Sequence, residues 1–145
     1  MRLLRWRHFL LSLVVLLSGV SVCGSAYSQD HRSSRINVEH GKMSRIKWHS
    51  TVDGRCRQEG FPIYKILLPP THGKLSYRKE MGAVGAPIPD PQVPIPPHCL
   101  GVRMLGRAIY YQSDPGFRGT DRVRVQTYFA PSHTTIENTI VITVR

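Results

Sequence analysis

The chain has 145 residues, with 20 lysines and arginines against 9 acidic residues, and three cysteines. This length suits one domain with its own hydrophobic core. The net charge of +11 favours anionic partners, but no nucleic-acid recognition motif accompanies it. Nothing beyond the first residues is long and apolar enough to predict a transmembrane helix.

Residues 1–26 are typical of a secretory signal peptide. Three arginines precede an apolar run at 9–22, and small residues close the segment. Cleavage is expected after Ala26, with Ser28 as the second choice. Lipidation of Cys23 is the alternative, although the bulky residue before it departs from a lipobox. The sequence therefore predicts a periplasmic or secreted protein.

Cleavage leaves Cys56 and Cys99 in a domain of about 119 residues. An even pair of cysteines in an exported chain predicts a disulfide. The bond would close a loop of about 44 residues, which in the chain-entropy model stabilises by roughly 4 kcal/mol. The 17 basic and 9 acidic residues that remain give a net charge of +8. This charge is compatible with an acidic polymer or phosphate-rich glycolipid of the cell envelope as partner, and equally with a solvated cationic surface that has no partner. A protein partner is a further possibility.

The rest of the chain reads as strands and turns. Residues 27–35 are polar and predict a flexible N-terminal arm. Further on, no segment shows a helical period, and short strands bounded by turn residues predict one all-β, antiparallel sandwich of about seven strands over 36–145. Gly106 is expected to mark a turn or a bulge. In chain order the expected strands cover 36–38, 43–48, 62–69, 73–78, 102–112, 121–129 and 138–145.

A proline-rich segment interrupts this pattern at residues 82–98, with six prolines between 87 and 97. Proline cannot donate to a β-ladder, so the segment is expected to cross the surface as extended polyproline II structure. A proline-rich ligand for a partner protein is the alternative interpretation.

The segment YYQSDPGFRGTDRVRV (110–125) predicts a turn between two strands. Pro115 presets φ, Gly116 permits a positive φ, and Gly119 leads the chain into the next strand. Phe117 is expected to plug the end of the core. Asp121 is expected to accept backbone N–H bonds.

This segment resembles the recurring signature of bacterial cadherin-like and immunoglobulin-like modules. PPTHGKL (69–75) resembles the Pro-x-His-Gly-x-Leu step that precedes it in those modules, and TIVITV (139–144) resembles their last strand. The resemblance covers 61–145 and implies an immunoglobulin-like (cadherin-like) β-sandwich, but it implies little about function. Cadherin-type calcium sites need clustered acids, whereas the acids here are scattered, so neither a metal nor another cofactor is expected.

One strand carries the candidate binding site. Alternate residues of a strand project from one face, arginine forks bind planar anions, and tyrosine stacks. A solvated face whose arginines discourage edge pairing is the alternative. The predicted binding strip consists of Arg122, Arg124, Gln126 and Tyr128.

No catalytic or zinc-binding motif accompanies the strip. The chain has no Gly-x-Ser-x-Gly elbow, no His-x-x-x-His and no Cys-x-x-Cys. The sequence therefore predicts a non-enzymatic binding or structural module of the bacterial cell envelope. A small secreted enzyme or enzyme inhibitor is the alternative.

Overall fold

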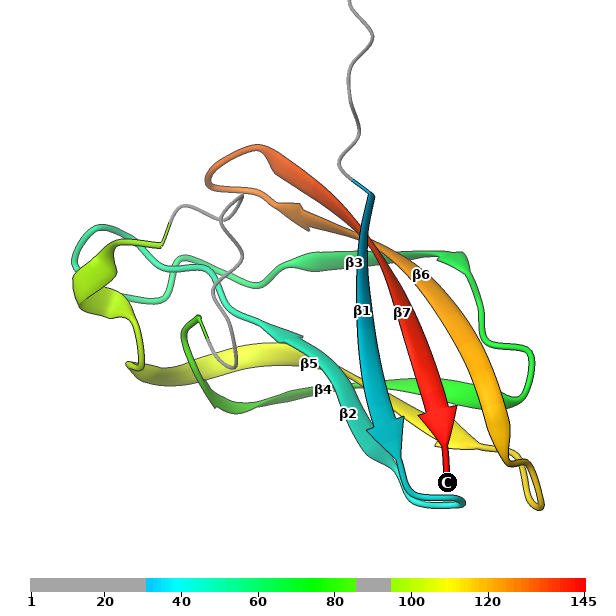
Figure 1. The fold of residues 1–145 in the computed structure, drawn as a ribbon. Helices are drawn as coiled ribbons and strands as arrows, with labels where there is room; N and C mark the ends of the chain where they lie inside the picture. Colours follow the sequence, from blue (N-terminus) through cyan, green and yellow to red (C-terminus); the bar gives the residue numbers. More distant parts are fainter. Residues whose placement is uncertain (1–30, 86–94) are drawn as a thin grey trace, which may run out of the picture.

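The computed structural model describes residues 31–85 and 95–145, which form two packed β-sheets (Figure 1). The strands are β1 (His31–Val38), β2 (Ser44–His49), β3 (Ile63–Leu68), β4 (Gly73–Ala83), β5 (Arg103–Ser113), β6 (Gly119–Phe129) and β7 (Thr134–Val144). One sheet has the order β1-β7-β6-β3 and the other β2-β5-β4. These seven strands and a disulfide between Cys56 and Cys99 confirm the predicted immunoglobulin-like sandwich.

The core lies between the sheets and follows from alternating burial in β6 and β7. In β6 the valines at 123 and 125 and Thr127 are fully buried, while the residues between them face outward. Burying one such aliphatic side chain stabilises by roughly 1.5–3 kcal/mol. The central cluster consists of Val38, Ile109, Tyr111, Val123, Val125, Ile140, Ile142 and Val144.

The first strand differs from the sequence prediction. Residues 31–35, expected as part of a flexible arm, belong to β1, which begins at His31. The physical reason is backbone pairing, because β1 runs parallel to β7 from His31 opposite Glu137 to Val38 opposite Val144. Polar side chains do not prevent a ladder of main-chain bonds. This is the one parallel pairing in the described sheets.

The fourth strand is longer than predicted. β4 continues to Ala83, because it pairs with β5 along its whole length without a register shift. Beyond it Val84 is buried, and its N–H donates to the Val102 carbonyl at 3.0 Å. The proline-rich crossover therefore begins after Val84 rather than at Gly82. Its central part, residues 86–94, lies outside the described residues, as do the predicted signal peptide and residues 27–30.

Gly106 does not mark a bulge, since the β4–β5 register passes through it unbroken. Its lack of a side chain leaves room for the indole of Trp48. A Cβ at Gly106 would lie 2.4 Å from Cε2 of Trp48, and a Cβ at Gly82 would meet the same atom at 2.4 Å. The two glycines therefore let the Trp48 indole lie against the sheet, where its Nε1 donates to the Glu80 carbonyl at 3.2 Å. In the described part of the chain, no helix is long and apolar enough to cross a membrane.

Candidate functional site

The predicted binding strip occupies the outer face of β6. Its two arginines are exposed, and Gln126 and Tyr128 are half-buried. One of its charges is already engaged, because Arg124 Nε lies 3.3 Å from a carboxylate oxygen of Glu137 on β7. Tyr128 OH lies 3.2 Å from Nδ1 of His133. The structure therefore brings the four residues to one face, but this face is part of an open sheet.

The turn residues predicted after β5 lie at one end of the sandwich. Gly116 has a φ of +80°, and the N–H of Phe117 donates to the Asp114 carbonyl at 3.2 Å. Phe117 is half-buried rather than a fully buried plug. It packs against the edge of the core and stacks on the His72 ring, with centroids 4.2 Å apart.

Asp121 ties this turn to the connection between β3 and β4. Its buried carboxylate accepts the backbone N–H bonds of Thr71 (3.0 Å), His72 (2.8 Å) and Arg122 (2.8 Å). It also accepts hydroxyl bonds from Thr71 at 3.0 Å and Tyr111 at 3.2 Å. Burial raises the pKa of Asp121, but the N–H donors outweigh it and hold the pKa below its ordinary value. This is a structural carboxylate.

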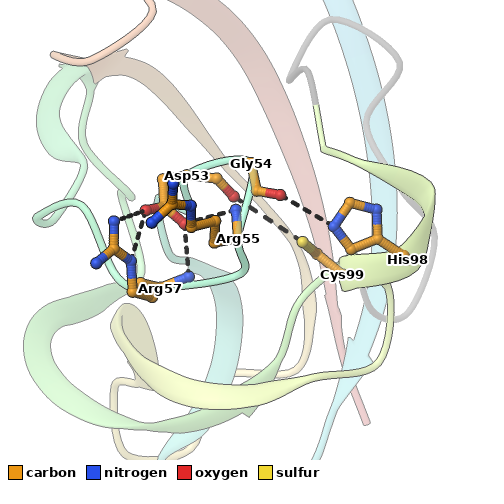
Figure 2. A network of polar contacts seen from close by, with 6 residues as sticks. All are labelled: Asp53, Gly54, Arg55, Arg57, His98 and Cys99. Atoms are coloured by element: carbon orange, nitrogen blue, oxygen red, sulfur yellow. Dashed lines mark hydrogen bonds and ion pairs between the residues drawn. The ribbon is translucent and has the colours of Figure 1, made fainter.

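A second constellation lies beside the disulfide between Cys56 and Cys99. Figure 2 shows its polar contacts around Asp53. Asp53 Oδ1 accepts the backbone N–H bonds of Arg55 at 2.9 Å and Arg57 at 2.8 Å, and Oδ2 accepts Nε of Arg57 at 2.9 Å. Inside this loop Cys56 adopts a φ of +59°, a conformation that non-glycine residues rarely take. The loop is thus closed by Asp53 on one side and by the bond to Cys99 on the other.

Three metal-type ligands lie beside this loop. The ligand atoms of Cys56, His98 and Cys99 are within 4.8 Å of one another. Both sulfurs are bonded to each other, however, and His98 Nε2 lies 3.0 Å from the Gly54 carbonyl oxygen. In the oxidised protein these three residues therefore close a loop and offer no thiolate to a metal.

A pocket opens between β3 and β4, each of which is an edge strand of its sheet. We call it the edge pocket. It has a volume of about 380 Å³, and none of its lining residues is acidic. Lysine, arginine and tyrosine side chains can bind anions through charge and hydrogen bonds. The lining residues are Tyr64, Tyr77, Arg78, Lys79 and Arg107.

Two cations dominate this pocket. Lys79 on β4 lies directly opposite Arg107 on β5, and we call these residues the cation pair. Arg107 Nη1 reaches across to donate to the Pro62 carbonyl at 3.2 Å, and Lys79 Nζ lies 4.4 Å from the Phe61 ring centroid. The charge of Arg78 acts less on the pocket, because its guanidinium lies on the other face of the sheet, 5.0 Å from the ring centroid of Tyr110. Like charges directly opposite each other destabilise a sheet. The stability of the fold therefore gives no reason for placing Lys79 opposite Arg107.

The inner wall of the pocket is the half-buried phenol of Tyr64. Burial raises the pKa of Tyr64, so its hydroxyl stays protonated, and it donates to the Arg107 carbonyl at 2.9 Å. Behind it Nδ1 of His49 lies 3.3 Å from the Tyr64 hydroxyl. His49 is half-buried, and its ring packs between Tyr64 and Phe129, with ring centroids 6.2 Å and 5.4 Å away. That burial, together with the charge of Lys47, lowers the pKa of His49 to about 3.

The edge pocket was not predicted from the sequence. The fourth strand was expected to end at residue 78, which left Lys79 outside the sheet, and Arg107 had no expected role. Had the strand been extended past residue 78, the spacing of two between Tyr77 and Lys79 would have placed both side chains on one face. The partner across the ladder is not readable from the sequence.

Comparisons with protein-family models, curated proteins and solved structures find no match for this chain. The resemblance to bacterial cadherin-like modules therefore stays a prediction.

Proposed function

We propose that this chain is an exported, non-enzymatic binding module of the bacterial cell envelope that captures an anionic group in the edge pocket. The observation that carries the proposal is the cation pair. Lys79 and Arg107 face each other across β4 and β5 in a pocket without an acidic lining residue. The negative charge of an anionic ligand would offset their mutual repulsion. Both residues can also donate charge-assisted hydrogen bonds to it, which are about twice as strong as neutral ones.

The chemistry of the lining supports binding over catalysis. The pocket is lined by cations and phenols, and the phenol of Tyr64 stays protonated. Lys79 and Arg107 keep N–H donors for an anion, whereas the Tyr64 hydroxyl already donates to the Arg107 carbonyl and so fixes the backbone beside the cation pair. Hydrolysis would need a nucleophile with a general base or a pair of carboxylates, and no lining residue is a histidine, serine, cysteine or acid.

The signal-like sequence at 1–26 supports the exported location, and the net charge of the chain supports the ligand class. An immunoglobulin-like sandwich by itself is compatible with many functions. The binding strip on β6 is the competing site, and the alternative of an enzyme or inhibitor has no specific observation in its favour.

The test compares two double variants of equal charge change, made in the exported, purified protein. Lys79→Gln with Arg107→Gln removes the cation pair, and Arg122→Gln with Arg124→Gln removes the same charge from the binding strip. Inorganic phosphate is titrated at low salt, with binding followed by NMR chemical shifts. Urea unfolding checks that both variants remain folded.

We expect the first variant to lower phosphate affinity by about tenfold or more, because each charged contact contributes roughly 1.5–3 kcal/mol. The strip variant should change the affinity much less. The reverse order of effects would move the site to β6. An absence of phosphate binding by the wild-type protein would refute the proposal.

A further inference from the structure

The inner face of β4 and β5 continues beyond the cation pair as a ladder of apolar and cationic pairs. The register between these strands has no shift, so residues directly opposite each other lie on the same face. Leu75 and Tyr111 at one end of this face pack into the core. The next three pairs along it, which we call the amphiphilic ladder, are Tyr77 with Ile109, Lys79 with Arg107, and Met81 with Leu105.

The ladder leaves the core gradually. Ile109 is fully buried, whereas Tyr77, Met81 and Leu105 are 51%, 50% and 36% exposed. The exposure of Tyr77 and Met81 is consistent with the edge position of β4, whereas Leu105 lies on the central strand β5 of the same sheet. Single exposed apolar residues are ordinary. Here, however, an apolar pair adjoins a cation pair on one continuous face.

We propose that the amphiphilic ladder binds an anionic lipid. The phosphate headgroup lies between Lys79 and Arg107, and the first part of the acyl chain lies along Met81 and Leu105. This inference rests on the proposed function and deepens it by naming the class of ligand.

The polar half of the argument is charge complementarity. Arg107 offers a planar fork and Lys79 a point charge, and a phosphate between them carries oxygens for both. The exposed Arg103 lies on the same face, one pair beyond Leu105, and adds to the attraction for an anionic lipid surface.

The apolar half distinguishes a lipid from a soluble anion. A free phosphate or an acidic sugar makes no use of Met81 and Leu105, which lie on the side of the cation pair away from the core. A lipid places hydrocarbon next to its phosphate, so burying these two side chains favours the lipid over the free headgroup.

The experiment uses the exported, purified protein with two kinds of vesicle, one of phosphatidylcholine alone and one of equal parts phosphatidylcholine and phosphatidylglycerol. Cosedimentation measures vesicle binding, and inorganic phosphate is titrated in parallel. Met81→Ser with Leu105→Ser removes the apolar pair. Ile63→Ser with Leu68→Ser is the matched control, because these side chains are 54% and 46% exposed on β3 but project from the outer face of the other sheet.

The wild-type protein should bind the phosphatidylglycerol vesicles and should bind phosphatidylcholine vesicles much more weakly. The variant at Met81 and Leu105 should lose about tenfold or more in vesicle affinity while keeping its affinity for inorganic phosphate. The variant at Ile63 and Leu68 should behave as the wild type.

Phosphate binding without vesicle binding, equal binding to both vesicles, or a variant at Met81 and Leu105 that binds vesicles normally would each overturn the lipid inference and leave the proposed function standing. Binding to neither phosphate nor vesicles would overturn both.

Discussion

Replacing Asp121 by alanine tests how the start of β6 is tied to the connection between β3 and β4. The carboxylate accepts three backbone N–H bonds, from Thr71, His72 and Arg122, and two hydroxyl bonds. Thr71 and His72 belong to the connection before β4, about fifty residues away in sequence. Asp121→Ala therefore removes the shared acceptor of two distant segments.

The magnitude follows from the fate of each donor. A hydrogen bond to a charged acceptor contributes roughly 1.5–3 kcal/mol. Thr71 and His72 are exposed, so water replaces part of what their N–H groups lose, and Tyr111 OH keeps the His72 carbonyl at 3.0 Å as an acceptor. We therefore expect a loss of about 3 kcal/mol in the free energy of unfolding, below the simple sum.

Urea unfolding at neutral pH measures this loss, with the slope against denaturant unchanged. Asp114→Ala is the matched control, because its backbone rather than its side chain bonds His72 and Phe117 in the same turn. It should cost less than about 1 kcal/mol.

Acid gives a second readout of the same carboxylate. The pKa of Asp121 is lowered in the folded protein, so its contribution is present above the ordinary aspartate pKa and is lost as pH falls through the folded value. Asp121→Asn should lack this acid-dependent loss. If Asp121→Ala destabilises no more than Asp114→Ala, the carboxylate does not hold the two segments together and the reasoning is refuted.

Two further predictions concern the interior and the disulfide. The pKa of His49 falls from 6.5 to about 3 on folding, so the unfolded chain binds the proton first and stability should fall by about 2 kcal/mol from pH 7 to pH 5; His49→Gln should show a shallower pH dependence in urea unfolding, and identical slopes would contradict the burial of the ring. The double substitution Cys56→Ala with Cys99→Ala should cost about 4 kcal/mol, because the bond closes a loop over a sequence separation of 43 residues. Reduced wild-type protein should unfold at the same urea concentration as this variant, and unchanged stability on reduction would argue against that contribution.

The sequence alone determined the elements whose cause is local. In β6 the alternation of Val123 and Val125 with arginines places the valines inward, and the structure buries both. The disulfide was also readable, because Cys56 and Cys99 are the two cysteines that remain after the signal-like segment. The first conclusion depends on the period of two along a strand, and the second depends on the number of cysteines.

The tertiary structure decided the features that depend on a neighbouring strand. β1 begins at His31 because β7 supplies backbone partners, and Gly106 is a seat for Trp48 rather than a bulge. The edge pocket exists because Lys79 and Arg107 fall opposite each other where the facing sheet ends. Periodicity reports which side of a strand a residue occupies. It does not report which strand lies beside it or how far the opposite sheet extends, and that coverage decides whether a side chain is core or binding surface.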